Sequence, residues 1–240
     1  MQAENSSGSR AELAGRSGHV AAQLFLGLAC YLFFVLPYAR RILGMKRVAP
    51  ERRLFVVNHV SLLDTILLGG VFWSRARLPI LVLGDAAVWR GSWLRNLLSS
   101  RVGFLIERGR SDRELLRRLQ TYGRAHEGFD LILFPEGTRG DGERVGPCQP
   151  GVYTIAQAAR VPIVPVFISG MQRVSTKTSP FRPIAGLRSI LVEFGPELSP
   201  EDYLELDRAA FSARIRESLQ AMAPGAKGPR PAQELSQKRA

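Results

Sequence analysis

Short apolar runs alternate with amphipathic segments along the chain from about residue 53 to residue 222. Such runs, rich in Val, Ile, Leu and Phe, are typical of buried strands, and most of the segments between them repeat their apolar residues at helical spacing. The predicted strands are 53–57, 78–83, 103–107, 130–134, 162–168 and 189–195, and the predicted helices are 61–73, 111–126, 151–160 and 207–222. This alternation predicts an α/β domain with a largely parallel sheet flanked by helices.

One predicted strand contains two prolines. In VPIVPV, Pro162 and Pro165 interrupt an otherwise apolar run. Because proline has no backbone N–H to donate to a neighbouring strand, it is uncommon in the middle of a sheet. We therefore expect 162–168 to be an edge strand or a strand that leads into the functional site.

An uncharged apolar segment precedes the domain at residues 20–36, and Gln23 is its only strongly polar residue. As a helix it would be about 26 Å long, a little short of the ~30 Å hydrocarbon core of a bilayer. No small-residue cleavage site follows it, which argues against a signal peptide. We expect an uncleaved membrane-anchoring helix that either spans the bilayer, with Pro37 and Tyr38 in the interface, or lies deep in the interface. A buried helix of a soluble domain is the alternative.

Basic residues follow this segment more often than they precede it. Arg10 and Arg16 are the only nearby positive charges before it. Those after it are Arg40, Arg41, Lys46, Arg47, Arg52 and Arg53. Because positive charge accumulates on the cytoplasmic side of membrane segments, we expect the main domain at the cytoplasmic face of the inner or plasma membrane.

Composition divides the chain into four parts. Residues 1–18 and the basic tail 224–240 are rich in small, polar and charged residues, so we expect both to be disordered. Between them we place the membrane-anchoring helix at 19–45 and the main domain at 46–223. We expect the core of that domain to begin near Arg53.

The charge balance of the whole chain points to an anionic partner. Lys and Arg number 33 against 21 Asp and Glu, which gives a net charge of +12, and nearly all the basic residues are arginine. Arginine offers a planar fork to phosphate, so we expect the partner to be an anionic membrane, a phosphorylated or acidic substrate, or nucleic acid. No helix-turn-helix, zinc-finger or aromatic RNA-binding motif supports nucleic acid.

Two cysteines without a Cys/His cluster support neither a disulfide framework nor a metal site.

The segment VWRGSWLRNLL, residues 88–98, interleaves aromatic and basic side chains. Trp89 and Trp93 alternate with Arg90 and Arg95, a composition suited to the headgroup layer of a membrane. The alternative is a half-buried helix with a solvated basic face.

The first candidate chemical motif is NHVSLLD, residues 58–64. A strand ends near Asn58, so His59 lies in the turn, and Ser61 is a natural N-cap of the next helix with Asp64 on its first turn. Ser-x-x-acid is a variant capping box, so Asp64 could serve the helix N-terminus alone. A carboxylate beside a turn histidine also orients its ring and stabilises the protonated form, as a general base requires. The two interpretations are compatible.

The second candidate motif is FPEGTR, residues 134–139, which follows the buried strand 130–134. Its polar groups lie at a strand's carboxyl end, where α/β sheets bind ligands. Gly137 permits close backbone approach, Arg139 could clamp a phosphate, and Glu136 could fix Arg139 or a substrate hydroxyl. A surface turn with a local ion pair is the alternative. Arg108, just beyond another strand's end, is a further candidate, although a lone arginine there is usually solvated.

The order NHVSLLD, GFLIER, FPEGTR and VPIVPV resembles the four motifs of the glycerolipid acyltransferase family typified by 1-acylglycerol-3-phosphate (lysophosphatidate) acyltransferase. The resemblance covers residues 53–168. It implies that His59 and Asp64 are the catalytic pair. It implies that the acceptor is bound by Arg108, Glu136, Gly137, Thr138 and Arg139. One departure is that PCQPG, residues 147–151, lacks the basic-aromatic-basic step that often precedes the family's glycine.

The resemblance implies a membrane-bound O-acyltransferase that needs no metal and no cofactor. It would move an acyl group from acyl-CoA or acyl carrier protein, as donor substrate, to the hydroxyl of a lysophospholipid such as 1-acylglycerol-3-phosphate, giving phosphatidate. His59 would take the hydroxyl proton while Asp64 holds its tautomer. The alternatives are another lysolipid acceptor of the lyso-ornithine or lysocardiolipin type, a CoA-independent transacylase, or a non-catalytic binder of anionic membranes. The sequence leaves the oligomeric state open.

Overall fold

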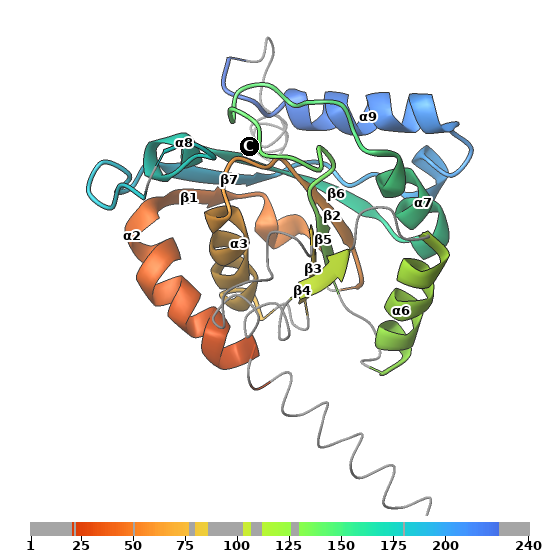
Figure 1. Cartoon of the computed structure of the whole chain (residues 1–240), viewed down its shortest axis with the longest axis horizontal. Coiled ribbons are helices and arrows are strands. Elements are labelled where there is room, and N and C mark those ends of the chain that lie inside the picture. Colours follow the sequence, from red (N-terminus) through yellow and green to blue (C-terminus); the bar gives the residue numbers. More distant parts are fainter. Residues whose placement is uncertain are drawn as a thin grey trace, which may run out of the picture.

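The computed structural model describes residues 21, 23–49, 51–76, 80–85, 103–106, 112–125, 130–179 and 181–225. Within these residues seven strands form one sheet (Figure 1). The strands are β1 (Ala39–Leu43), β2 (Leu54–Val57), β3 (Ile80–Asp85), β4 (Gly103–Ile106), β5 (Asp130–Leu133), β6 (Ile163–Ser169) and β7 (Ile190–Phe194). The helices include α2 (Leu36–Tyr38), α3 (Leu63–Trp73), α6 (Asp112–Ala125), α7 (Pro150–Ala159), α8 (Met171–Val174) and α9 (Arg208–Gln220). Shorter turns are the π-helix η1 (Tyr31–Val35) and the 3₁₀-helices η2 (Met45–Arg47) and η3 (Pro200–Asp202).

The strand order across the sheet is β1-β7-β6-β2-β5-β3-β4. All neighbours are parallel except β6 and β7, which are antiparallel. The predicted α/β domain with a largely parallel sheet is therefore confirmed. Parallel neighbours end at the same edge of the sheet, so the residues that follow β2, β5 and β6 gather at that edge.

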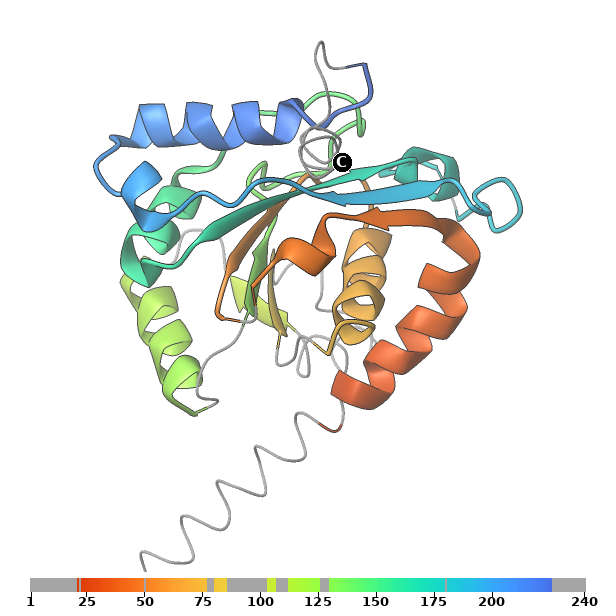
Figure 2. The same cartoon turned by 180° about the vertical axis from the view of Figure 1, so that it is seen from behind.

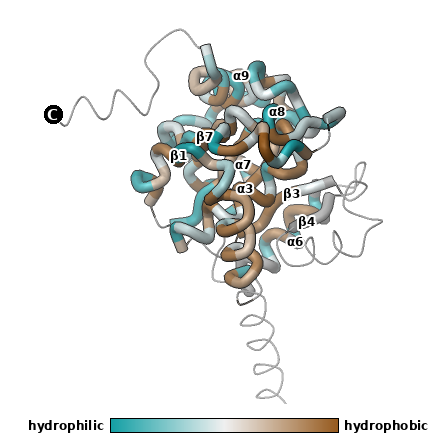
Figure 3. Tube along the Cα trace, turned by 90° about the vertical axis from the view of Figure 1, so that its left-hand side faces the viewer, coloured by the Kyte–Doolittle hydropathy of each residue, from teal (hydrophilic) through white to brown (hydrophobic). Residues whose placement is uncertain are grey.

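The sheet has a hydrophobic core on each face, because successive side chains of a strand point to opposite sides. In β2, Leu54 and Val56 face the helices α6, α7 and α9. Phe55 and Val57 face α3 and the N-terminal helical segment, and all four are fully buried. Figure 2 shows the two helical layers from behind. Hydrophobic residues concentrate around α3 in the middle of the molecule, whereas β1 and α9 carry many hydrophilic ones (Figure 3).

The expectation that 162–168 is an edge strand is wrong, because β6 lies between β7 and β2. Pro165 pairs with Val56 on the β2 side, and its carbonyl accepts a hydrogen bond from the Gly195 N–H at 2.8 Å. The nitrogen and the carbonyl of one strand residue point to the same side. The missing N–H of Pro165 therefore faces β7 just beyond the last antiparallel pair, Val166 with Phe194, so no ladder bond to β2 is lost.

The apolar segment before the domain packs one of its faces on α3. Residues 23–30 are helical and continue into η1 and α2. Gly27 and Gly70 allow the close approach, since a Cβ on Gly70 would lie 2.6 Å from Val35 and one on Gly27 would lie 2.7 Å from Trp73. Gln23 is 2% exposed, and its amide exchanges two hydrogen bonds of 3.1 Å with the backbone of Ile80.

The opposite face of this segment is apolar and exposed. Its exposed side chains are Leu24, Phe25, Leu28, Leu32, Phe33 and Leu36. We call this set the N-terminal stripe. In the part of the chain that the structure describes, no helix combines the length and the apolar character needed to cross a bilayer, so the prediction of a transmembrane helix is not confirmed.

Two boundaries of the predicted domain organisation need correction. Residues 39–43, which we placed in the anchoring helix, form β1 and pair in parallel with β7. The core also begins earlier than Arg53, because Phe34, Val35 and Tyr38 are buried in it. A local pattern cannot reveal β1, since its hydrogen-bonding partner lies far along the chain. Residues 1–18, 88–98 and 226–240 lie outside the described residues.

Candidate active site

His59 and Asp64 meet at the carboxyl end of β2. His59 lies two residues after the strand ends at Val57, and Asp64 lies on the first turn of α3. His59 Nδ1 is 2.9 Å from Asp64 Oδ2. Asp64 is fully buried, whereas the His59 side chain is 14% exposed. His59 Nε2 makes no hydrogen bond to any described residue, so this nitrogen is available to a substrate.

Asp64 also organises the backbone of the turn. The same Oδ2 accepts hydrogen bonds from the N–H groups of Val60 at 2.7 Å and Ser61 at 2.9 Å. Ser61 Oγ accepts from the Leu63 N–H at 3.3 Å, although the helix itself starts at Leu63, with Leu62 in the cap position. Asp64 thus contacts the imidazole and fixes the turn that leads into α3, whereas no side chain caps the helix at Leu62.

The FPEGTR turn packs against His59 from the neighbouring strand. Because β5 pairs in parallel with β2, the residues after both strands lie side by side. The ring of Phe134 stacks on the His59 imidazole, with centroids 4.1 Å apart and planes inclined by 24°. The His59 carbonyl accepts a hydrogen bond from the Gly140 N–H at 2.6 Å. The histidine is therefore fixed through its ring and through its backbone.

Glu136 is buried and engaged with the backbone. Its Oε1 accepts from the His59 N–H at 3.2 Å, and its Oε2 accepts from the Gly146 N–H at 3.0 Å. No ion pair joins Glu136 to Arg139 in the structure, so the suggestion that Glu136 fixes Arg139 gains no support. Each carboxylate oxygen can accept a further bond, and acceptor binding by Glu136 stays a prediction.

The last three residues of the turn, 137–139, are less buried than Glu136. Gly137 adopts a left-handed conformation with φ of +63°, and a Cβ there would lie 2.7 Å from Gln149, so glycine is required on two counts. Thr138 is exposed, and Arg139 is half-buried. No hydrogen bond or ion pair to a described residue holds the guanidinium of Arg139. Arg108 lies outside the described residues.

Sequence reasoning missed the groups that support the pair. Phe134 reads as the last apolar residue of a strand, and nothing in its type signals a stacking role. Gly140 and Gly146 act through their backbone N–H groups, which any residue other than proline possesses. Gln149 donates from Nε2 to the Glu136 carbonyl at 3.2 Å. Its position beside Gly137 results from tertiary folding, and no local pattern predicts it.

The electrostatics around the turn are visible at Cys148. Burial, reinforced by the negative charge of Glu136 and opposed by Arg216, raises the pKa of the Cys148 thiol to about 11. The thiol is therefore neutral at physiological pH and is a poor nucleophile. Among the described residues there is no cluster of His, Cys, Asp or Glu that could hold a metal ion.

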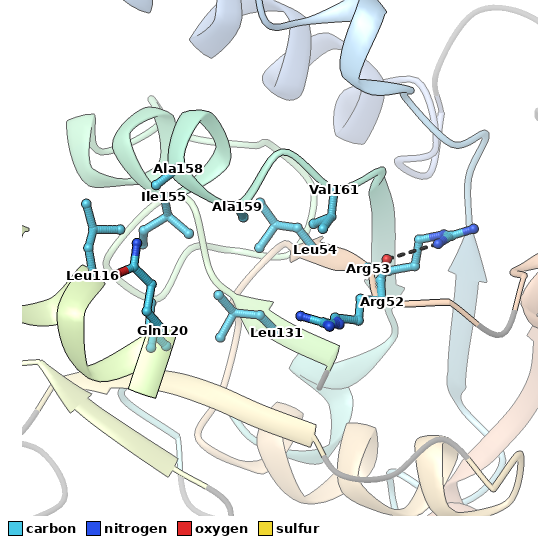
Figure 4. Close-up of a pocket in the computed structure, with 11 residues that line it drawn as sticks. Arg52, Arg53, Leu54, Leu116, Gln120, Leu131, Ile155, Ala158, Ala159 and Val161 are labelled. Carbon is cyan, nitrogen blue, oxygen red and sulfur yellow. Dashed lines mark hydrogen bonds between the residues drawn. The ribbon is translucent and has the colours of Figure 1, made fainter. Parts of the chain in front are cut away.

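An apolar pocket of about 320 Å³ lies at the other end of the strands (Figure 4). It is lined by residues at the starts of β2 and β5, including Leu54 and Leu131, and by Leu116 and Gln120 of α6 and Ile155 of α7. His59 and the FPEGTR turn do not line it. The candidate site lies at the carboxyl ends of the strands, where α/β sheets bind ligands. This pocket lies at their amino ends and is therefore separate from it.

A family model described as Acyltransferase matches residues 40–169, more than half of the chain. The chain belongs to the acyltransferase family. The acyltransferase match contains the His59–Asp64 pair, the FPEGTR turn and the strands that bring them together. The resemblance inferred from the four motifs is thereby confirmed.

Relatives of this acyltransferase include enzymes named for two acceptors. It is 29% identical to the chloroplastic 1-acyl-sn-glycerol-3-phosphate acyltransferase BAT2 of Brassica napus, over 65% of the chain and 43% of that protein. It is 33% identical to the lyso-ornithine lipid O-acyltransferase of Pseudomonas aeruginosa, over 56% of the chain and 48% of that protein. The chain thus spans less than half the length of these relatives.

The acyltransferase also resembles a solved structure. The crystal structure of the 1-acyl-sn-glycerophosphate (LPA) acyltransferase PlsC from Thermotoga maritima aligns with a TM-score of 0.58, over 82% of this chain and 76% of that chain. The sequence identity is 18%, so this likeness concerns the fold.

Proposed function

We propose that the protein transfers a fatty acyl group from an acyl thioester to the hydroxyl of a lysophospholipid. The observation that carries this proposal is the 2.9 Å contact between His59 Nδ1 and the buried Asp64 carboxylate. That contact supports a proton on Nδ1, since a carboxylate can only accept there, and an unprotonated Nε2 that serves as the base at the carboxyl edge of the sheet. A membrane or nucleic-acid binder without catalysis would have no use for such a base.

The reaction proceeds by direct transfer. His59 Nε2 takes the proton of the acceptor hydroxyl as that oxygen attacks the thioester carbonyl carbon. The tetrahedral intermediate collapses, the carbon–sulfur bond breaks, and the leaving thiolate takes the proton from the imidazolium. Asp64 stabilises the imidazolium between the two proton transfers. The products are an ester-linked lipid and a free thiol, and no covalent enzyme intermediate is needed.

The preferred acceptor is 1-acylglycerol-3-phosphate, with phosphatidate as product. Arg139 supports this choice, because its guanidinium has no partner among the described residues and can bind a phosphate bidentately. Arg108 is the second predicted phosphate ligand. The lyso-ornithine lipid relative supports a second candidate acceptor, which contains no phosphate. We infer acyl-CoA or acyl carrier protein as the donor, with no metal or cofactor.

We also infer that the protein works at an anionic membrane, on its cytoplasmic face. The N-terminal stripe supports this inference, because six large apolar side chains lie exposed on one face of a helical segment. Contiguous exposed apolar side chains mark membrane or partner contacts. The net charge of +12 suits a negatively charged surface.

The test is an acyl-transfer assay on purified protein with both donor types and with 1-acylglycerol-3-phosphate, lyso-ornithine lipid and lysocardiolipin as acceptors. His59→Ala should lower kcat by about 10²–10⁴-fold. Asp64→Asn should also lower it, because a neutral amide no longer stabilises the imidazolium that forms on His59. Asp207→Asn is the matched control, since Asp207 caps α9 and asparagine caps equally well. Near-normal turnover in folded His59→Ala would refute the mechanism.

A further inference from the structure

The loop between α8 and β7, residues 175–189, of which the structure describes 175–179 and 181–189, carries exposed apolar side chains. Phe181, Ile184 and Leu187 are 50%, 83% and 51% exposed. Among the described residues, every large hydrophobic side chain that is exposed lies either in this loop or in the N-terminal stripe. Exposed apolar side chains confined to two segments indicate a contact surface rather than a general property of the molecule.

The loop is held in a defined shape by its own backbone. The Arg182 N–H donates to the Val174 carbonyl at 2.8 Å, and the Leu187 N–H donates to the Ile184 carbonyl at 3.2 Å. Ser189 Oγ donates to the Gly186 carbonyl at 2.7 Å. Gly186 packs so closely that a Cβ there would lie 2.5 Å from Val174. The apolar side chains are thus presented outward by a fixed turn.

The loop adjoins the end of the helical segment that carries the N-terminal stripe (Figures 1 and 2). The Arg188 N–H donates to the Pro37 carbonyl at 3.0 Å. The rings of Tyr38 and Phe181 meet edge to face, with centroids 5.8 Å apart. The two apolar segments are therefore joined at residues 37–38.

The loop also lies at the edge of the sheet that holds the candidate active site. β6 runs parallel to β2, so the chain leaves β6 at the same edge at which β2 leads into His59. Gly142 lies between the first turn after β6 and the site. A Cβ on Gly142 would lie 3.1 Å from Gln172 Oε1 of α8 and 3.0 Å from Val60, the residue after His59.

The charge of this region selects the partner. Between Met171 and Val192 the chain has four basic residues and no acidic one. These are Arg173, Lys177, Arg182 and Arg188. Apolar side chains set among cations fit an anionic lipid surface, where the former enter the acyl boundary and the latter stay among the headgroups. A second copy of this chain, also at +12, would meet like charge.

We propose that the 175–189 loop is a second membrane-contact element, which inserts Ile184 and its apolar neighbours into an anionic lipid layer beside the N-terminal stripe. The proposal rests on the proposed function only in assigning the lipid layer as the source of the acceptor. Two joined contacts fix the orientation of the sheet, and they hold the edge that carries His59 beside the layer in which a lysolipid resides.

The test measures vesicle binding and activity separately. The full chain and its Ile184→Ser/Leu187→Ser variant are sedimented with phosphatidylcholine vesicles that contain or lack phosphatidylglycerol. The variant should bind the anionic vesicles about tenfold more weakly, and its turnover of a short-chain, monomeric acceptor should equal that of the parent. Ala209→Ser, at an exposed position of α9, is the control and should bind like the parent.

A second readout places the loop in the lipid. Bromine-labelled lipid should quench the tryptophan fluorescence of Ile184→Trp more than that of the parent. The added tryptophan of Ala209→Trp should not be quenched. Equal binding of parent and double variant, or equal quenching at both positions, would overturn the proposal. A dimer that the double variant dissociates, with vesicle binding unchanged, would also overturn it and assign the loop to self-association. If the loop inserts normally but the protein transfers no acyl group, the proposed function is refuted and the loop proposal stands.

Discussion

Glu136 and Phe134 reach His59 from the strand next to its own, and they do so in different ways. Phe134 holds the plane of the imidazole, and Glu136 holds the backbone nitrogen from which the side chain extends. Glu136 also ties the loop at Gly146. A catalytic base must be held to within a fraction of an ångström of its productive position. If His59 is that base, as proposed, these contacts supply the restraint from outside the His59–Asp64 pair.

Glu136→Gln should therefore impair positioning more than binding. The amide group would direct a donor toward one of the two backbone N–H groups that Glu136 now accepts, and a buried donor left unpaired costs about 1–3 kcal/mol. We expect kcat to fall by about tenfold or more, with the KM of acceptor and donor nearly unchanged. Steady-state kinetics with each substrate varied would check this. A rise confined to the acceptor KM would instead support acceptor binding by Glu136.

Arg139 separates the two candidate acceptors. Lysine keeps the charge but loses the planar fork, so Arg139→Lys should raise the KM for 1-acylglycerol-3-phosphate by about tenfold and leave the donor KM unaltered. The same variant should leave the KM for lyso-ornithine lipid unchanged. Arg144→Lys, an exposed arginine nearby on the chain, is the control. Unchanged acceptor kinetics in Arg139→Lys would exclude a phosphate clamp.

At the scale of elements, the strands and long helices follow from sequence because their signals are local. Apolar runs mark β2, β5 and β6, and helical spacing marks α7 and α9. The His59–Asp64 contact was also foreseeable, since a turn and one helical turn fix both residues. β1 and the central position of β6 were not foreseeable, because the partner strand decides them. The support of His59 by Glu136 is equally non-local.

The N-terminal helical segment illustrates what the pattern leaves undecided, because neighbouring phenylalanines have opposite environments. Phe33 is 78% exposed and Phe34 is 6% exposed. Phe33→Ser should weaken vesicle binding and leave the free energy of unfolding nearly unchanged. Phe34→Ser should lower the free energy of unfolding by about 3–5 kcal/mol, through the lost burial and the cavity it leaves. Sedimentation with vesicles and denaturant unfolding of both variants would check this pair; identical behaviour would contradict the assigned faces.

At the scale of the whole molecule, the N-terminal segment is part of the folded core as well as a surface. Gln23 completes hydrogen bonds at the start of β3, and η1 packs against α3. A transmembrane anchor that could be removed without harm would show neither feature.

Deleting residues 1–38 should therefore destabilise the domain in solution and in detergent alike. The deletion removes three buried core residues, Phe34, Val35 and Tyr38, and exposes the face of α3 around Gly70. Thermal unfolding followed by circular dichroism should show a clearly lower midpoint temperature or should lose its cooperativity. A chain that lacks only residues 1–18 provides the comparison. If the chain that lacks residues 1–38 unfolds like the full chain, the N-terminal segment is dispensable for the fold.

The pairing of β1 with β7 has a consequence for how the protein is made. Ala39 pairs with Ile190, so a strand near the beginning of the chain must wait for one near its end before its edge of the sheet can close. Synthesis proceeds from the N-terminus, a domain generally folds as a unit, and contacts between distant residues form slowly. The N-terminal stripe leaves the ribosome long before β7, the partner of β1, has been made. A nascent chain held at the membrane by that stripe would complete its sheet beside the lipid, with its first and last strands joined in the final step of folding.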